Sequence, residues 1–555
     1  MTLSREGFSP QSYNYEVENF RDQEYPCLKG EIYLDHGGST IPAKSLLREV
    51  AADLSTHLYG NPHSASAPSA LAGHRVDEIR EQALRFFDAD PEHFDLVFVA
   101  NATAAMKLVM DAFKDHCEGT QKLSRHHRQR FWYAYHRDAH NSLIGIREAA
   151  EGGHRCFGSD QQVEDWIRGK NSKSTNKNRT VRLFGYCGQS NMTGRRLPRS
   201  WPSEIRHSPH TSDVHTLFDA AALATTAPLD LSNPGQAPDF TCLSFYKIFG
   251  FPDLGALIIR KASPGAQILA SRRYFGGGTV DMVTCLDTSA FHAKKNSDLH
   301  SHLEDGTLAF HSIIALSSAF RTHARLFKSM RHVSAHTTAL TAHLYKRLSS
   351  LRHINGRPLV AVYNDSTATF GDAHTQGATI AFNVMRPDGT FVAPSTVERA
   401  ANARNIYLRS GSLCNPGGAA KYLGWTSAEL FKLYEEGLRC SRPSEVVSGR
   451  PTGVVRCSLG AVSIVRDVET FLRFLEEVFG DCTAEEPAGA GEVPETEART
   501  GTMTSSVRAS AEMSVGSGKA EQRSRRMGLR KLILSCLSSG RRGRDGEEVV
   551  NLKER

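Results

Sequence analysis

Short apolar runs alternate with amphipathic segments along the first half of the chain. From residue 72 to 86, apolar residues recur every three or four positions, which predicts a helix. Helices are also predicted after Pro42 and over 104–113 and 142–150. Runs of large apolar residues predict buried strands over 32–34, 96–99, 131–135, 181–186, 215–218, 240–243 and 256–259. This alternation predicts an α/β fold with a mainly parallel sheet covered by helices.

The second half of the chain follows a different pattern. Two long helical patterns, about 308–328 and 332–351, precede shorter alternating segments. These shorter segments predict strands over 378–384 and 454–458 and helices over 396–404, 427–436 and 466–479. We therefore expect an N-terminal arm (1–30), a large domain (31–330), a smaller α+β domain (331–480, with parts of the N-terminal segment) and a tail (481–555).

The expected tail differs from the rest in composition. Ala, Gly, Glu, Pro, Thr and Ser dominate to about residue 525, and basic residues follow. Such a segment buries too little apolar surface to offset its ordering entropy, so we expect the tail to be disordered. Residues 169–179, rich in Lys, Asn and Ser, predict a solvated insertion. Residues 529–536 fit either a short amphipathic helix on an acidic lipid surface or partner, or a disordered segment.

Composition excludes several classes of protein. The chain has 555 residues, 40% of them hydrophobic and 23% charged. The net charge of +7 reflects the basic tail, so it does not predict nucleic-acid binding. No run approaches the roughly 20 apolar residues of a membrane span, and the N-terminus lacks a signal-peptide core. The 11 cysteines form no C-x-x-C pair, which argues against a zinc ribbon or a disulfide framework and suits a reducing compartment such as the cytoplasm; no metal site is expected.

Lys247 and Asp219 are the first candidates for chemistry. Lys247 lies between an apolar run and the turn formers Gly250 and Pro252, so we expect two strands joined by a tight turn, with Lys247 at a strand end. Partial desolvation there lowers an amine's pKa and frees it to attack a carbonyl. Asp219 ends another apolar run. Pyridoxal phosphate needs such a pair: the lysine forms the Schiff base, and the carboxylate pairs with the pyridine nitrogen. A lysine that snorkels to water is the alternative.

Three further ligand-type residues follow predicted strands. Thr103, at a predicted helix start, suits a phosphate, although it also suits an N-cap. His140 suits stacking on a flat cofactor, and Asn191 suits a hydrogen bond to a phenolate oxygen. Singly, these are a solvated histidine and a turn asparagine. With Asp219 and Lys247 they predict one site at the carboxyl edge of the sheet.

Ten segments then support a family resemblance. They include Ser-Phe-Tyr-Lys at 244–247 and Cys-Asn-Pro-Gly at 414–417. The full set covers 33–40, 60–64, 101–105, 218–221, 244–250, 275–279, 304–307, 376–383, 409–417 and 455–460. It resembles class V aminotransferases, the fold-type-I pyridoxal phosphate enzymes that include cysteine desulfurases. Within them it is most similar to the N-terminal NifS-like domain of molybdenum cofactor sulfurases, over roughly residues 20–480.

The resemblance implies a seven-stranded type of sheet, pyridoxal 5'-phosphate and specific roles. Lys247 would carry the cofactor, Asp219 would pair with its ring and His140 would stack on it. The implied phosphate ligands are Thr103, Ser244, Tyr246 and, from a neighbouring subunit of a homodimer, Thr307. Asn61 and Arg456 would bind the substrate, with the Arg456 guanidinium on its carboxylate. Cys414 would carry a persulfide.

The residues around Cys414 independently predict a reactive thiol. Residues 410–418 form a loop of small residues, so the thiol can be exposed, and nearby Arg409 favours the thiolate. An ordinary loop cysteine is the alternative. Cys457, in a predicted buried strand, and Cys440 are poorer candidates.

These residues predict a cysteine desulfurase that delivers sulfur from L-cysteine to molybdenum cofactor or to a separate acceptor protein. The alternatives are selenocysteine lyase, aminotransferase or epimerase chemistry, or a non-catalytic scaffold. A carrier thiol at Cys414 favours the desulfurase. The family's sulfurases carry a second, cofactor-binding domain, whereas folded-looking sequence here ends near 480. A shortened homologue, a truncated product and a separate acceptor chain all remain open.

Overall fold

A computed structural model describes residues 12–121, 129–170, 180–286, 290–295, 297–439, 442 and 445–481. The expected tail beyond 481, the segment 529–536, most of the insertion and Cys440 lie outside the described residues. No helix in the described ranges is both long and apolar enough to cross a membrane.

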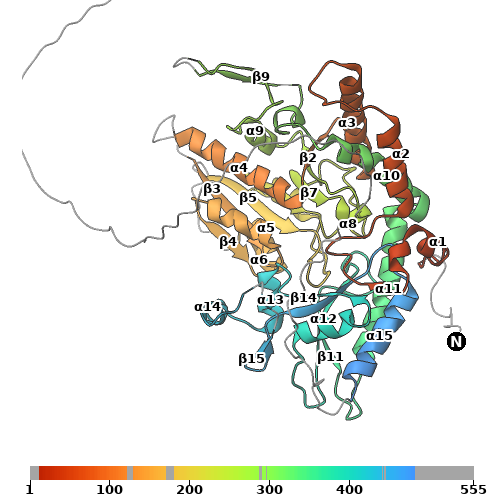
Figure 1. Cartoon of the computed structure of the whole chain (residues 1–555). Coiled ribbons are helices and arrows are strands. Elements are labelled where there is room, and N and C mark those ends of the chain that lie inside the picture. The colour runs from red at the N-terminus through yellow and green to blue at the C-terminus, as the bar shows by residue number, and fades with distance from the viewer. Residues whose placement is uncertain are drawn as a thin grey trace, which may run out of the picture. The chain divides into compact units, whose positions relative to one another are not determined.

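A seven-stranded sheet forms the larger layer (Figure 1). Its spatial order is β2-β8-β7-β6-β5-β3-β4. The strands are β2 (Phe94–Val99), β3 (Arg130–His136), β4 (His154–Phe157), β5 (Thr180–Cys187), β6 (Val214–Asp219), β7 (Phe240–Ser244) and β8 (Gly255–Arg260). Six strands of this sheet run in the same direction, and β8 runs antiparallel to them. The expected mainly parallel sheet is therefore confirmed.

Helices cover both faces of this sheet because alternate strand residues point to opposite sides. In β2, Leu96 and Phe98 belong to a core with α3 (Ala67–Phe86) and α10 (Phe310–Phe327). Val97 faces a second core with α4 (Ala102–Gln121) and α9 (Pro264–Ala270). The other helices of this half are α1 (Glu16–Glu24), α2 (Lys44–Thr56), α5 (Asn141–Ile144), α6 (Asp160–Ile167), α7 (Trp201–His207) and α8 (Tyr246–Phe249).

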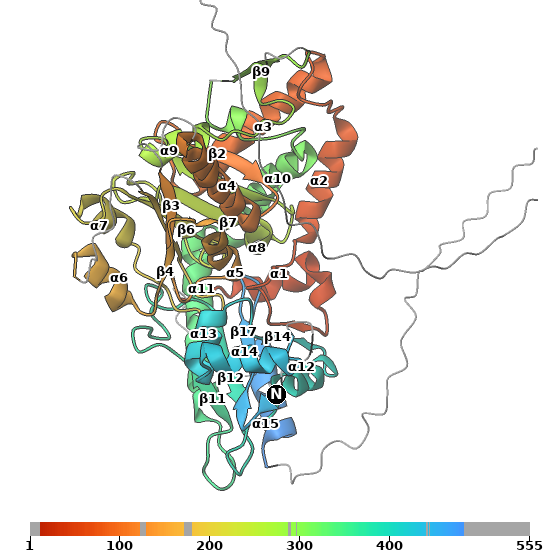
Figure 2. The ribbon, with the colours of Figure 1, turned by 90° about the vertical axis from the view of Figure 1, so that its left-hand side faces the viewer.

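A four-stranded antiparallel sheet forms the centre of the second, smaller half of the fold (Figure 2). Its order is β11 (Val360–Tyr363), β12 (Thr379–Val384), β17 (Val454–Ser458) and β14 (Arg409–Gly411). The helices of this half are α11 (Met330–Ser350), α12 (Pro394–Asn402), α13 (Pro416–Leu423), α14 (Ser427–Glu435) and α15 (Val465–Phe479). Strand pairs complete the fold: β1 (Ile32–Tyr33) with β13 (Ile406–Tyr407), β9 (Val280–Val283) with β10 (His292–Lys294), and β15 (Val446–Val447) with β16 (Arg450–Pro451).

Two local predictions were wrong. The helix expected over 142–150 is only the one-turn helix α5, followed by a 3-10 turn over Gly145–Ala149. The connection after β7 is a one-turn helix, α8, and Lys247 lies on it rather than at the strand end itself. Gly250 then reverses the chain at a φ of 79°, a conformation that suits glycine. Short apolar runs do not distinguish a helical turn from a strand.

A buried ionic cluster joins elements of the two sheets. The Arg195 guanidinium, only 2% exposed, lies 2.8 Å from the Asp138 carboxylate after β3 and also pairs with Asp160 of α6. Asp365, after β11, lies 3.7 Å from Arg195 and 2.5 Å from the ammonium of Lys421 on α13. Burial alone would raise the pKa of Asp365, but hydrogen bonds from Lys421 and Thr367 and the charge of Arg195 lower it.

Replacing Arg195 by alanine should lower the free energy of unfolding by about 3–5 kcal/mol near pH 7, because Asp138 and Asp160 lose the guanidinium that pairs with both. The lowered pKa of Asp365 is stabilising above the usual carboxyl range, and this stability is lost as pH falls. The difference in free energy of unfolding between wild type and Arg195→Ala should therefore become smaller below about pH 4. Urea titrations measure both effects. Arg85→Ala, which breaks an exposed pair with Glu81, should cost less than about 1 kcal/mol. Equal losses in the two variants would contradict a role for the cluster.

Candidate functional site at the carboxyl edge of the sheet

The five residues predicted to share a site follow strands that run in the same direction. Thr103 follows β2, His140 follows β3 and Asn191 follows β5. Asp219 is the last residue of β6, and Lys247 lies three residues after β7. Since these strands are mutually parallel, all five residues lie at one edge of the sheet.

The Lys247 amine and the Asp219 carboxylate form the electrostatic centre of this edge. Burial lowers the pKa of Lys247; the Asp219 charge opposes this shift and the Arg456 charge adds to it. A neutral amine is the nucleophilic form, so the site favours attack on an aldehyde. Asp219 is 7% exposed and accepts a hydrogen bond from the backbone N–H of Ala221 at 3.0 Å. The carboxylate is thereby oriented at the strand end.

His140 presents a neutral imidazole. It is the N-cap of α5, where its Nδ1 accepts a hydrogen bond from the Ser142 backbone N–H at 3.1 Å. Nδ1 therefore carries no proton, and the neutral ring is protonated at Nε2. Burial lowers the pKa of His140, with Lys247 adding to the shift and Asp219 opposing it. An uncharged flat ring of this kind suits stacking on an aromatic cofactor.

Hydroxyl groups gather at the start of α4. The Ser244 hydroxyl accepts a hydrogen bond from the Ala102 backbone N–H at 3.0 Å, and the Thr103 hydroxyl lies 2.8 Å from the Ser142 hydroxyl. The helix N-terminus adds partial positive charge, so these groups suit a phosphate. Tyr246 is half-buried on α8. Sequence reasoning missed Ser142, which the N-cap turn of α5 brings to Thr103.

Arg456 shares a carboxylate with Arg409. Asp35 pairs with the buried Arg456 guanidinium and lies 2.7 Å from Arg409. Arg456 also donates to the Asn191 carbonyl oxygen at 2.9 Å, and its Nε has no hydrogen-bond partner among the described residues. Two guanidinium groups facing one carboxylate leave net positive charge, which suits a carboxylate ligand. Asp35 lies within the predicted motif 33–40, but sequence reasoning did not assign it this role.

The loop that carries Cys414 is held against the same edge. The Cys414 carbonyl accepts a hydrogen bond from the Asn141 backbone N–H at 2.9 Å. Asn191 donates from Nδ2 to the Leu413 carbonyl at 2.7 Å, and Asn415 donates to Asn191 Oδ1 at 3.0 Å. Cys414 itself is exposed. The amide predicted to bind a phenolate oxygen therefore holds this loop.

The backbone of the loop is strained at two adjacent residues. Leu413 and Cys414 have φ values of 57° and 53°, a region that costs a non-glycine residue of order 1–3 kcal/mol. The carbonyls of both residues are the groups bound by Asn191 and Asn141, so these hydrogen bonds hold the strained turn. Arg409, predicted to favour the thiolate, is engaged by Asp35 instead.

Asn61 and Thr307 form a second cluster. Asn61 donates from Nδ2 to the Thr307 hydroxyl at 3.1 Å, and His63 Nε2 lies 3.3 Å from the Gly306 carbonyl. Both predicted residues are exposed. The structure thus places Asn61 and Thr307 in contact with each other. Neither forms a hydrogen bond with Lys247 among the described residues.

The donor set of the sheet edge fits pyridoxal phosphate. A partly desolvated lysine, an oriented carboxylate and a neutral flat imidazole match its aldehyde, ring nitrogen and ring face. The hydroxyl groups at the α4 N-terminus match its phosphate.

Comparisons with known proteins agree with this geometry. The model of the family Aminotransferase class-V matches residues 32–471. The chain is 52% identical over 469 residues to the molybdenum cofactor sulfurase of Aspergillus fumigatus, covering 84% of this chain and 54% of the relative. It is 54% identical over 450 residues to that of Neosartorya fischeri, covering 80% and 51%. The chain therefore spans about half the length of the curated relatives it matches.

Solved structures share the fold. An apo cysteine desulfurase from Thermococcus onnurineus has a TM-score of 0.60 at 18% identity, covering 86% of this chain and 99% of that one. The cystine C-S lyase C-DES in complex with its product cysteine persulfide has a TM-score of 0.55 at 16% identity, covering 82% and 100%. At these identities the likeness shows the fold alone.

Arg456→Gln should raise the pKa of Lys247, because removing a nearby positive charge makes the protonated amine easier to form. The rate at which the protein captures pyridoxal 5'-phosphate, followed by visible absorbance against pH, reports the neutral amine. Its inflection should move to higher pH. Arg347→Gln, which removes a guanidinium paired with Glu469, should leave the profile unchanged. Superimposable profiles for Arg456→Gln and wild type would contradict the assigned coupling.

Proposed function

This chain belongs to the class-V aminotransferase family, and from that membership we propose that it is a pyridoxal phosphate-dependent enzyme that mobilises sulfur from L-cysteine. The sulfur is held as a persulfide on Cys414. Its proposed destination is molybdenum cofactor, either directly or through a separate acceptor protein, which the printed name of the relatives supports.

The position of Cys414 carries this proposal. It is an exposed thiol whose own backbone is hydrogen-bonded to Asn141, next to His140. Transamination and epimerisation require no protein thiol at this place, whereas removal of sulfur from cysteine requires a nucleophile for the sulfur atom. The thiol therefore favours desulfuration over the other chemistries of the family.

Each residue of the sheet edge has a separate role in the steps that precede sulfur transfer. Held by Lys247 through its aldehyde carbon, pyridoxal phosphate would supply that carbon to the substrate amino group in place of the lysine, and a ring that withdraws electrons from Cα. Asp219 holds a proton on the ring nitrogen, and His140 packs on the ring face. Arg456 binds the substrate carboxylate. Once released, the Lys247 amine takes the proton from Cα, a role that its lowered pKa supports.

The sulfur step balances without an external oxidant or reductant. The Cys414 thiolate attacks the substrate Sγ, so an S–S bond forms and the Cβ–S bond breaks. The electron pair of the broken bond remains with Cβ, which takes up a proton, and the Lys247 ammonium returns the proton to Cα. The products are a persulfide on Cys414 and alanine.

Cys414→Ala tests this assignment. With L-cysteine, the change in the visible spectrum of the reconstituted enzyme should be the same as in wild type, because amine exchange precedes the thiol step. Alanine release should fall at least about tenfold, equivalent to 1.4 kcal/mol of lost transition-state stabilisation. Release of alanine from L-selenocysteine should fall less, because selenium leaves without thiol attack.

Cys285→Ala, which removes another exposed thiol, is the matched control and should release alanine at the wild-type rate. Wild-type release by Cys414→Ala would exclude Cys414 as the carrier. A wild-type protein that remains colourless after addition of pyridoxal phosphate would overturn the enzyme assignment as a whole.

We also propose a homodimer in which Thr307 lies near the partner's cofactor. Exposed apolar side chains support this, notably Leu58, at 77% exposure, near Asn61, and Met282 on the β9–β10 hairpin, at 61%. A second copy packed there would cover them. Light scattering at micromolar concentration should give about twice the chain mass of 61.1 kDa, and Met282→Asp should shift the protein toward monomer. A monomer with full cofactor occupancy would refute the shared site.

A reducing location such as the cytoplasm is proposed as well. The described cysteines are free thiols, among them exposed Cys27, Cys156 and Cys285. Exposed thiols persist in reducing compartments, and the proposed carrier Cys414 needs its thiol free.

A further inference from the structure

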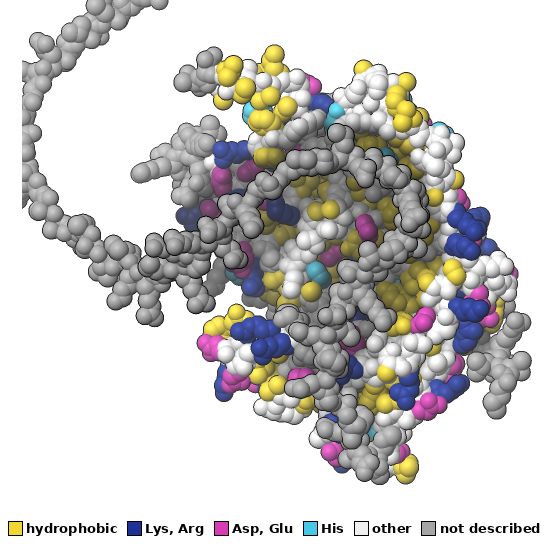
Figure 3. Space-filling model, viewed as in Figure 1, with side chains coloured by type: hydrophobic (Ala, Val, Ile, Leu, Met, Phe, Trp, Pro, Cys, Tyr) yellow, Lys and Arg dark blue, Asp and Glu magenta, His cyan; other side chains and the backbone are white. Residues whose placement is uncertain are grey.

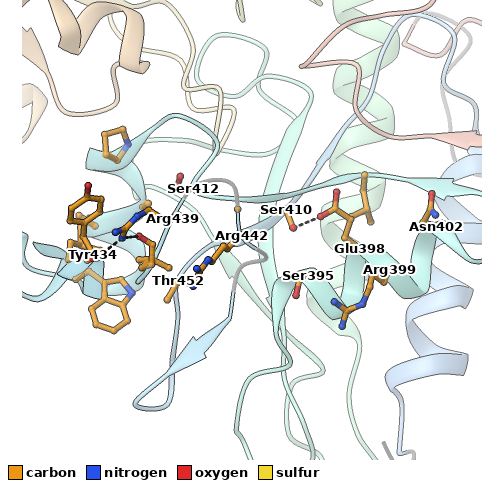
Figure 4. Close-up of a pocket in the computed structure, with 18 of the residues that line it drawn as sticks. Ser395, Glu398, Arg399, Asn402, Ser410, Ser412, Tyr434, Arg439, Arg442 and Thr452 are labelled. Carbon is orange, nitrogen blue, oxygen red and sulfur yellow. Dashed lines mark hydrogen bonds between the residues drawn. The ribbon is translucent and has the colours of Figure 1, made fainter. Parts of the chain in front are cut away.

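A pocket of about 930 Å³ lies behind the Cys414 loop. It is lined by residues of α12, β13, β14, α13 and α14 and, after α14, by Leu438, Arg439 and Arg442 (Figure 4). None of the residues assigned above to cofactor or substrate lines it. It is therefore separate from the site at the sheet edge.

The pocket combines positive charge with aromatic surface. Arg399, Arg439 and Arg442 line it, and the carboxylate among the lining side chains, Glu398, accepts a hydrogen bond from the Ser410 hydroxyl. Figure 4 shows Arg439 toward one end, Glu398 toward the other and Arg442 between them. Over α14, Lys and Arg side chains lie beside hydrophobic and acidic ones (Figure 3). The balance of charge favours an anionic ligand.

Two aromatic side chains of the pocket lie beside guanidinium groups. The Arg439 guanidinium carbon lies 3.9 Å from the centroid of the exposed Tyr434 ring, and the guanidinium donates to the Leu438 carbonyl at 2.8 Å. Trp425 is buried, donates from Nε1 to the Pro451 carbonyl at 2.8 Å, and has the Arg450 guanidinium carbon 3.8 Å from the centroid of its ring. The exposed Tyr434 ring and the Arg439 guanidinium beside it therefore offer the surface that a planar conjugated molecule could contact.

The Cys414 loop separates this pocket from the Lys247 site. Ser412 and Pro416, two residues before and after Cys414, line the pocket. On the other side, the carbonyls of Leu413 and Cys414 are bound by Asn191 and Asn141. A molecule in the pocket would thus contact the same short loop that carries the thiol.

We propose that this pocket is a second binding site, for a planar conjugated anion, and that its occupancy is sensed by the Cys414 loop. The guanidinium groups pair with the anionic group, and the Tyr434 side chain contacts the ring system. This site goes beyond the function proposed above, and its test requires no turnover.

Pterin-6-carboxylate, a fluorescent planar anion, is the probe, and 6-methylpterin is its uncharged match. Fluorescence polarisation with the full-length, cofactor-loaded protein should show saturable binding of the carboxylate and at least about tenfold weaker binding of the methyl compound. Arg439→Gln and Arg399→Gln should each weaken carboxylate binding about fivefold or more. Arg347→Gln, on α11, should not change it. Circular dichroism checks that each variant is folded.

Coupling to the loop is measured by alkylation. Saturating pterin-6-carboxylate should change the rate of Cys414 alkylation by iodoacetamide at least about twofold and leave that of Cys285 unchanged. Arg439→Gln should abolish this effect while leaving the rate of Cys285 alkylation unchanged.

No saturable binding up to millimolar concentration would overturn the proposal, as would equal binding of the two pterins or equal affinity in wild type and Arg439→Gln. Displacement of the probe by a segment of a partner protein, with no effect on Cys414 alkylation, would identify a protein-docking surface instead. Because binding is read without L-cysteine, these outcomes are independent of whether the enzyme desulfurates.

Discussion

The hydrogen bonds of one buried amide join the two halves of the proposed active site. Asn415 is fully buried; it donates to the Asp138 carbonyl and to Asn191 Oδ1, both at 3.0 Å, and accepts from the Gly418 backbone N–H at 2.9 Å. Asp138 and Asn191 follow strands of the large sheet, whereas Gly418 is in the first turn of α13. An unpaired buried amide is costly, so this arrangement tolerates few alternatives. The position of the adjacent Cys414 depends on it.

Charge placement around this amide serves both structure and chemistry. Arg195 neutralises the carboxylates beneath the loop, and Asp35 holds two guanidinium groups beside it. The first cluster is buried and closed, since cations and carboxylates contact one another. The second leaves excess positive charge where an amino acid substrate would bring its carboxylate. Burial of Lys247 beside this excess charge favours the neutral amine that the proposed chemistry needs.

The loop also gives the molecule two distinct sides. One side faces the sheet edge with Lys247, and the other lines a pocket rich in arginine and aromatic surface. A thiol between two sites is suited to accept a group on one side and present it on the other. The positive φ values of Leu413 and Cys414 show that the hydrogen bonds around the loop determine its conformation, because such strain persists only where the surrounding structure holds it.

The sequence alone determined most of the elements and which residues to propose for the main site. Buried parallel strands are long apolar runs, and ligands bind where such strands end, so Asp219 and Lys247 could be placed without coordinates. Local pattern failed where the choice between helix and turn depends on surroundings, as in the short helix α5. Asp35, Ser142 and Asn415 were not identified because their partners lie far along the chain, up to 421 residues away in the pair of Asp35 with Arg456. The tertiary structure alone decided which polar groups are buried together, because burial and pairing depend on packing between distant segments.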